Sequence, residues 1–201
     1  AEIANAKIGL TIESGAESVK VNGSSFHDID GHAIYGCPDE LNNTHFVNVG
    51  LNDQSYALRI DQCSDDKEYA ECLVDQSYGG IQFTLNGAFR DITLKRWILQ
   101  NTTATHALYV ATASNLGKLT IFDSTIQDNA SYGVEFYGDE LEMRRTVMGG
   151  NNSTAIRLNN GFAVITDSEI TDHTVALYIG AGADDSSRVN RCNLYENENF
   201  H

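Results

Sequence analysis

The chain has 201 residues, of which 41% are hydrophobic and 20% charged, so a disordered chain is excluded and one globular domain over residues 1–201 is predicted. The 28 acidic residues outnumber the 13 lysines and arginines, and the formal charge of −15 disfavours nucleic acid and anionic membranes as partners. No apolar run approaches the length of a membrane span, so no membrane insertion is expected.

Short segments with an apolar residue on either side of a polar or aromatic one recur along the chain. The first apolar residues of successive segments lie 21 to 27 positions apart. If these segments are strands stacked in register, their middle residues form one outward-facing row, here called the central column. The segments are AIYG from Ala33, ALRI from Ala57, GIQF from Gly80, ALYV from Ala107, GVEF from Gly133, AIRL from Ala155 and ALYI from Ala176. The central column is Tyr35, Arg59, Gln82, Tyr109, Glu135, Arg157 and Tyr178.

A second family of segments precedes these strands and alternates apolar with polar residues, as a strand with one buried face does. A polar pair interrupts most of them, as a bend between two short strands would. Further polar corners lead into the central-column strands. The segments include ITLKRWIL from Ile92, LTIFDSTI from Leu119, LEMRRTVM from Leu141, AVITDSEI from Ala163 and RVNRCNLY from Arg188. The bends are Asp123-Ser124, Arg144-Arg145 and Asp167-Ser168, and the corners are Asp128-Asn129, Asn151-Asn152 and Asp172-His173.

Each repeating unit therefore has three short strands and three corners, and no helical period is present. The pattern predicts an all-β fold: a right-handed parallel β-helix of about eight coils. A sandwich of antiparallel strands is the alternative, although Asn-Gly and Asp-Gly turns occur only at unit boundaries.

The stretch from Leu116 to Phe200 resembles the pectin-lyase-like superfamily of β-helix repeats, and the unit LTIFDSTIQDNASYGVEFYG fits that pattern best. The likeness weakens toward the N-terminus, where SDDKEYAE is inserted. The resemblance implies the fold, but its function is open because this superfamily includes lyases, hydrolases, epimerases, phage tailspikes and adhesins.

Four cysteines are present, and none forms a CxxC pair typical of a zinc site. Cys63 has two rival disulfide partners, since Cys72 would close a polar loop and Cys37 follows a neighbouring strand. Cys192 is expected to be a free, buried thiol. A disulfide would fit a secreted or cell-surface protein.

The central column suits a carbohydrate chain. Its three tyrosines offer flat faces to the C–H side of a sugar ring, and its two arginines offer forked donors to carboxylate or sulfate. We expect a polysaccharide to bind along Tyr35, Arg59, Gln82, Tyr109, Glu135, Arg157, Asn159 and Tyr178. No cofactor or protein-bound metal is predicted. Calcium stays an open alternative, as an ion that bridges the acidic chain and an acidic polymer.

Two residues beyond the central column lies a second outward position, here called the trailing column. It places Tyr137 and Asn159 beside Tyr109, Glu135 and Arg157, in one polar patch in mid-solenoid. The trailing column is Cys37, Asp61, Thr84, Ala111, Tyr137, Asn159 and Gly180.

Whether the chain is an enzyme is open. If it is, a polysaccharide lyase or epimerase is favoured, with Arg157 neutralising a carboxylate and Tyr109 or Tyr137 as base or acid. Hydrolysis is disfavoured, because Glu135 and Asp61 are the only acids of the two columns and lie three coils apart. The alternative to a catalytic role is that Glu135 and Arg157 form an ordinary cross-strand ion pair.

The competing function is a non-catalytic structural or adhesive segment of a surface protein or fibre. The next column strand would begin just past His201, so we expect a fragment of a longer chain or end-to-end association through an uncapped coil. His32 and His106 are interpreted as solvated corner residues, and Trp97 as core.

Overall fold

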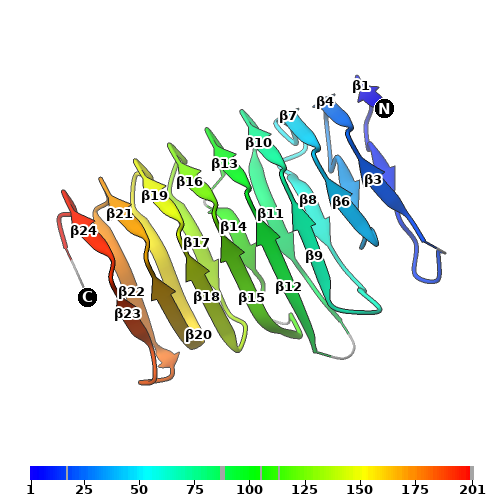
Figure 1. The fold of residues 1–201 in the computed structure, drawn as a ribbon. Coiled ribbons are helices and arrows are strands. Elements are labelled where there is room, and N and C mark those ends of the chain that lie inside the picture. Colours follow the sequence, from blue (N-terminus) through cyan, green and yellow to red (C-terminus); the bar gives the residue numbers. More distant parts are fainter. Residues whose placement is uncertain (17, 87–88, 105, 113, 200–201) are drawn as a thin grey trace.

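A computed structural model shows a right-handed parallel β-solenoid of about eight coils, with no helix among the residues that it describes (Figure 1). The structure describes residues 1–16, 18–86, 89–104, 106–112 and 114–199. Every strand pairing within these ranges is parallel, so the antiparallel sandwich is wrong and the predicted β-helix is confirmed. The coils run from the N-terminus at one end of the stack to the C-terminus at the other.

Each coil contributes one strand to each of three sheets, in the order A, B, C along the chain. Sheet A forms the narrow upper edge in Figure 1. Its strands are β1 (Glu2–Ala4), β4 (Ser25–Ile29), β7 (His45–Val49), β10 (Leu73–Asp75), β13 (Ile98–Gln100), β16 (Thr125–Gln127), β19 (Val147–Gly149), β21 (Glu169–Thr171) and β24 (Asn193–Tyr195).

Sheet B lies on the far side of Figure 1, and sheet C faces the viewer. The two are joined by β20, whose first half pairs with β17 and whose second half pairs with β18. Sheet B comprises β2 (Leu10–Thr11), β5 (Ile34–Tyr35), β8 (Tyr56–Ile60), β11 (Gly79–Phe83), β14 (His106–Val110), β17 (Tyr132–Phe136), β20 (Thr154–Thr166) and β22 (Val175–Ala183). Sheet C comprises β3 (Lys20–Asn22), β6 (Glu40–Asn42), β9 (Lys67–Ala70), β12 (Arg90–Lys95), β15 (Leu116–Phe122), β18 (Glu140–Arg144), the second half of β20, and β23 (Arg188–Asn190).

The core is a set of stacked apolar columns inside the coils. The first apolar residue of each central-column strand points inward and is at most 3% exposed. Trp97 is also buried, as predicted, and its indole nitrogen donates to the carbonyl of Tyr69 at 2.9 Å. Parallel strands covered on one face by the core keep the register of these columns, which fixes what points outward. The inward residues are Ile34, Leu58, Ile81, Leu108, Val134, Ile156 and Leu177.

The corners on either side of sheet A use left-handed backbone. Asp128 and Asp172 adopt positive φ after sheet A, and Asp123 and Asp167 do so before it. Short polar side chains tolerate this conformation best, which explains the Asn and Asp signals in the sequence. At the corner predicted to be Asn151-Asn152 the left-handed residue is instead Gly150, one position earlier.

Amides stack on the inner side of the later corners. Asn129 donates from Nδ2 to the side-chain oxygen of Asn151 at 2.8 Å, and both residues are fully buried. His173 occupies the next position and its ring Nδ1 lies 3.0 Å from the carbonyl oxygen of Asn151. This ladder pairs buried polar groups from coil to coil, and His173 stands in the place of an asparagine, with its Nε2 atom left without a hydrogen-bond partner among the described residues.

The disulfide joins Cys37 to Cys63, and their Cα atoms are 5.2 Å apart. Of the two possible partners of Cys63, it is therefore Cys37 and not Cys72 that forms the bond. Cys72 is a free, buried thiol. Cys192 is free as expected, but it is half-buried rather than buried. The bridge links two neighbouring coils near the N-terminal part of sheet B.

Candidate functional site

The central column is in register across seven coils. Pairing aligns its residues one to one along β5, β8, β11, β14, β17, β20 and β22. The side chains differ in exposure, since Tyr178 is 40% exposed while Glu135 is only 6% exposed. Neighbouring side chains therefore cover Glu135 even though it points away from the core.

A further outward row, here called the leading column, lies three residues before the central column. It arises because two successive residues of each strand face inward, as with Ala107 and Leu108, both fully buried. The residue before them then points outward again. Within this row Gly79 pairs with Tyr56 and His106 pairs with Tyr132. The leading column is His32, Tyr56, Gly79, His106, Tyr132, Thr154 and Val175.

Sequence reasoning missed the leading column, although a signal was present. Every central-column strand has a small residue, Ala or Gly, directly before its first apolar residue. If inward and outward residues alternated strictly, this small residue would point outward. It instead faces inward and lies against the next coil, which leaves little room for a side chain. A Cβ on Gly133, for example, would lie 2.7 Å from the carbonyl oxygen of Ala155.

Glu135 is the centre of the site. One carboxylate oxygen, Oε2, pairs with Nε2 of His106, and the other accepts from Nδ2 of Asn159 at 2.8 Å. Nε of Arg157 lies 3.6 Å from Oε1. Burial alone would raise the pKa of Glu135, but His106, Asn159 and Arg157 together outweigh burial and hold that pKa below its usual range. Glu135 is therefore an ionised, buried carboxylate.

His106 is not a solvated corner residue, and that interpretation was wrong. It lies in β14, its side chain is 16% exposed, and both ring nitrogens have partners. Nε2 contacts Glu135, and Nδ1 lies 3.0 Å from the hydroxyl of Tyr56. His32, the other histidine of the leading column, is likewise part-buried and its Nδ1 lies 2.8 Å from the carbonyl of Tyr56.

Tyr56 reaches His106 across an intervening coil. Gly79 occupies that coil, and a Cβ there would lie 2.6 Å from Cδ1 of the Tyr56 ring. Gly79 has no positive φ, so its lack of a side chain serves close approach rather than an unusual backbone. Tyr56, His106 and Glu135 thus form one hydrogen-bonded chain drawn from β8, β14 and β17.

Aromatic rings surround this chain. The His106 ring is stacked on both Tyr109 and Tyr132, with centroids 4.7 and 5.5 Å apart. The Arg157 guanidinium lies 5.4 Å from the ring centroids of Tyr132 and Tyr178. Burial is the first cause that raises the pKa of Tyr56, Tyr109 and Tyr137, and the charge of Glu135 adds to it. These phenols stay protonated at neutral pH.

The N-terminal part of the face is arranged differently. Arg59 lies over the Tyr35 ring at 5.1 Å from its centroid, and its Nε donates to Oγ1 of Thr84 at 3.4 Å. The Tyr35 hydroxyl donates to Asp61 at 3.4 Å. Among the described residues Arg59 has no acidic partner within 4 Å, so its charge is available to a ligand. A hollow of about 280 Å³ lies beside Tyr35 and Asp61.

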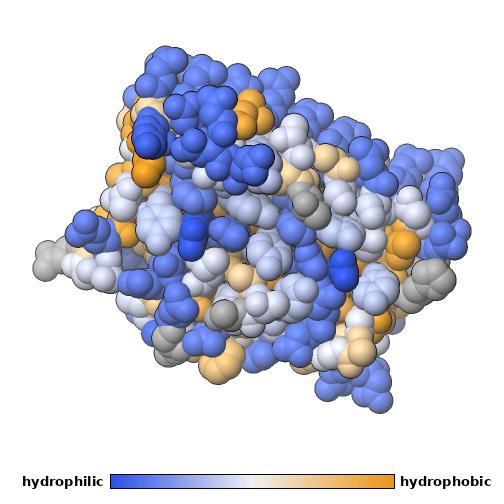
Figure 2. Space-filling view, turned by 180° about the vertical axis from the view of Figure 1, so that it is seen from behind, coloured by the Kyte–Doolittle hydropathy of each residue, from blue (hydrophilic) through white to orange (hydrophobic). Residues whose placement is uncertain are grey.

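The structure therefore brings most of the predicted site together. Tyr109, Glu135, Arg157 and Asn159 form one patch with Tyr137, whose ring meets that of Tyr109 edge-on at 6.4 Å. Tyr35 and Arg59 form a separate pair toward the N-terminal end, and Gln82 lies between the two groups in register with both Arg59 and Tyr109. Figure 2 shows this face as mostly hydrophilic to intermediate, with the hydrophobic residues gathered toward its margins.

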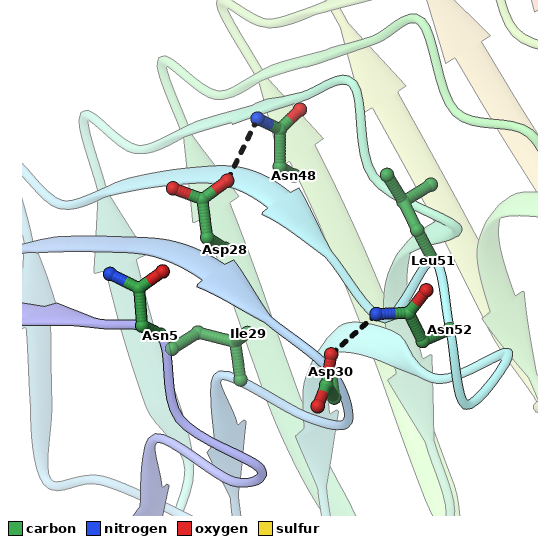
Figure 3. Close-up of a pocket in the computed structure, with 7 residues that line it drawn as sticks. All are labelled: Asn5, Asp28, Ile29, Asp30, Asn48, Leu51 and Asn52. Atoms are coloured by element: carbon green, nitrogen blue, oxygen red, sulfur yellow. Dashed lines mark hydrogen bonds between the residues drawn. The ribbon is translucent and has the colours of Figure 1, made fainter.

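Another hollow, larger than the one beside Tyr35, lies away from this face. A hollow of about 600 Å³ opens at the corner after sheet A, between Asp28 and Asp30 and their amide partners Asn48 and Asn52 (Figure 3). Nδ2 of Asn48 donates to Asp28 at 3.1 Å. Its side chains bond one another as a corner ladder does, so we assign it to the architecture and not to the site.

Comparison with known proteins agrees with the fold. Residues 106–201 match the family model described as "Right handed beta helix region". Together with the parallel solenoid, this match confirms the resemblance to right-handed β-helix repeat proteins of the pectin-lyase-like kind. No curated protein and no solved structure matches the chain. In the described part of the chain, no helix has the length and apolar character of a membrane span.

Proposed function

We propose that the outward face of sheet B binds a polysaccharide, whose chain runs along the solenoid axis. The observation that carries this proposal is the in-register central column, which presents tyrosine rings, guanidinium groups and an amide over seven consecutive coils. Coils stack about 4.8 Å apart, so successive sugar rings lie within reach of successive coils. A repeating ligand is the natural partner of a repeating surface.

The chemistry of the face supports sugars over other repeating polymers. Tyrosine rings cover the C–H side of a pyranose while their hydroxyls form hydrogen bonds with the sugar. Arg59 and Arg157 can hold a carboxylate or sulfate substituent. The net charge of −15 opposes a densely anionic polymer at long range, so a sparsely substituted chain, or one bridged by calcium, fits best.

Secretion or display at the cell surface is part of the proposal. The Cys37–Cys63 disulfide supports it, because such bonds persist in oxidising compartments. Chemistry on the bound chain of the lyase or epimerase type also belongs to the proposal. Hydrolysis does not, since Glu135 lies in β17 while Asp61 directly follows β8, so these acids of the central and trailing columns are three coils apart.

Retention on immobilised polysaccharides tests the binding. The panel should include neutral, sulfated and uronate-containing polymers, each with and without calcium. Tyr109→Ala and Arg157→Ala should each weaken retention by about tenfold or more, as loss of a central contact does. Tyr195→Ala and Arg191→Ala are matched controls, because both residues are exposed on other surfaces of the solenoid. Failure of the unaltered chain to bind any polymer would overturn the proposal and favour the structural or adhesive alternative.

A further inference from the structure

We propose that the outward face of sheet A, from β7 to β21, is the interface of a weak dimer with a second copy of this chain. The two copies face each other about a two-fold axis that runs along the strands, between β13 and β16. Their strands are then parallel, and their solenoid axes point in opposite directions. Sheet B stays uncovered in this dimer, so the dimer does not depend on the proposed polysaccharide binding.

A row of outward residues with an apolar centre runs along this face and is here called the edge row. Pairing places Ile98 between Leu73 and Thr125, and it places Val147 on the far side of Thr125. Ile98 and Val147 are each 41% exposed, so a partner that covers them removes apolar surface from water. The edge row is His45, Leu73, Ile98, Thr125, Val147 and Glu169.

The order of residues in the edge row suits a second copy of the same row. Reversing the row about its midpoint places its two central residues opposite each other. Leu73 then faces Val147 of the second copy, and His45 faces Glu169 of the second copy. The Tyr195 hydroxyl donates to one oxygen of Glu169 at 2.7 Å, which leaves the other oxygen for the histidine. Apolar side chains therefore meet at the centre of the interface and polar ones at its rim.

The charged corner between sheets C and A follows the same symmetry. Two positions before the edge row, the charge alternates from coil to coil, in the order Glu71, Arg96, Asp123 and Arg145. About the proposed axis Glu71 faces Arg145 of the second copy. Arg96 likewise faces Asp123 of the second copy. An axis through β13 itself would bring Arg96 against Arg96, so the alternation favours an axis between two coils.

The corner after sheet A also matches its own reversed copy. Three positions after the edge row, Asn101 faces Asp128 of the second copy, and Asn48 faces Asp172 of the second copy. Each of these contacts pairs an amide donor with a carboxylate acceptor. A dimer with antiparallel strands would instead bring Asp123 opposite Asp128, and two facing carboxylates repel each other. The arrangement with parallel strands is therefore favoured.

The size of the patch indicates a weak dimer. Coils in both copies repeat about every 4.8 Å, so a match at the centre persists along the whole face. From β7 to β21 the patch is about 24 Å long, and across a strand and its two corners it is about 16 Å wide. This is small for a protein interface. The formal charge of −15 adds repulsion at long range, which salt screens.

Sedimentation equilibrium from micromolar to millimolar protein, at about 0.15 M salt, tests the dimer. The unaltered chain should pass from monomer to dimer as its concentration rises. Val147→Lys should weaken association by about tenfold or more, because it places a charge at the apolar centre of the interface. Val164→Lys is the matched control, since Val164 points outward from sheet C and is half-buried. Circular dichroism checks that both variants keep the fold.

A charge swap tests the arrangement of the two copies. His45 and Glu169 lie five coils apart in one chain, about 24 Å, so they can meet only between copies. His45→Glu should weaken the dimer several-fold, and adding Glu169→Lys should restore it.

Three results would overturn the proposal. The first is a chain that stays monomeric over the whole concentration range. The second is association that Val147→Lys leaves unchanged, which would place the contact elsewhere, such as at an end of the stack. The third is a double variant of His45→Glu and Glu169→Lys that associates no better than His45→Glu alone, which would contradict the two-fold axis.

Discussion

Two sets of charged pairs in this solenoid differ in a way that separates architecture from function. At the corner between sheets C and A, Arg96–Glu71, Arg145–Asp123 and Arg191–Asp167 pair across neighbouring coils. Their side chains are 33 to 73% exposed, and the same arrangement recurs. On sheet B the pair His106–Glu135 is 16 and 8% exposed and does not recur in the described coils.

The difference teaches what to look for in a repeat fold. Charged pairs that recur from coil to coil belong to the stacking of the coils. Each exposed pair of this kind contributes little to the free energy of unfolding. A buried ionised group that occurs in one coil has no such periodic role and carries a desolvation cost. The His106–Glu135 pair is therefore one place where the fold departs from its own repeat, and the proposed function centres on it. Lys67 with Asp39, at the N-terminal end of sheet C, is another such pair.

Of the variants that test this comparison, those that remove Glu135 should change the stability of the protein most. Glu135→Ala leaves His106 and Asn159 without their shared partner, and we expect the free energy of unfolding to fall by about 3 kcal/mol, as for other broken buried pairs. Arg145→Ala at the corner should change stability little, and that change should vanish at high salt. Urea denaturation of both variants at low and high salt measures this, and equal losses would contradict the distinction.

Filling the space above Gly79 should have the next largest effect. A methyl group in Gly79→Ala would meet the Tyr56 ring, and we expect a loss of about 2 kcal/mol from overpacking together with displacement of Tyr56 from His106. Gly149→Ala is the matched control in sheet A, where the nearest atom to a new Cβ is 3.7 Å away. Thermal unfolding and NMR of the Tyr56 ring check this, and an unperturbed ring would show that Gly79 is not needed for the contact.

The smallest expected effect concerns how the stability of the folded protein depends on pH. Because the pKa of Glu135 is lower in the folded than in the unfolded protein, its ionised form contributes stability above the unfolded pKa of about 4.5. That contribution is lost as pH falls through the lower folded value. The stability difference between the unaltered chain and Glu135→Gln should therefore shrink below about pH 4.5. A difference that stays constant from pH 7 to pH 3 would contradict the ionised state of Glu135.

The fold could be predicted because the sequence signals of its strands and corners recur in successive coils. Central-column residues such as Arg59 and Gln82 were placed in register from the spacing of inward Leu58 and Ile81, since a strand side chain alternates with period two. The leading column could not be obtained this way. Ala107 and Leu108 both face inward, which breaks the alternation, and His106 was consequently assigned to a solvated corner.

The chemistry of the site depends on contacts between coils that the sequence does not display. Tyr56 and His106 are 50 residues apart and meet only because Gly79 leaves room between them. The ion pair of Glu135 with Arg157 was foreseen from adjacent column positions, and it is present at 3.6 Å. Its stronger partner, His106, belongs to a column that alternation does not reveal.

Chemical-shift mapping of the bound polysaccharide tests the central claim most directly. Amide and side-chain resonances are followed while an oligosaccharide of the retained polymer is added. We predict that the shifts concentrate on outward residues of β14, β17 and β20, including Tyr109, Glu135 and Arg157, and extend along the central column. Shifts concentrated on sheet A, at the charged corner or in the hollow beside Asp28 would contradict the account.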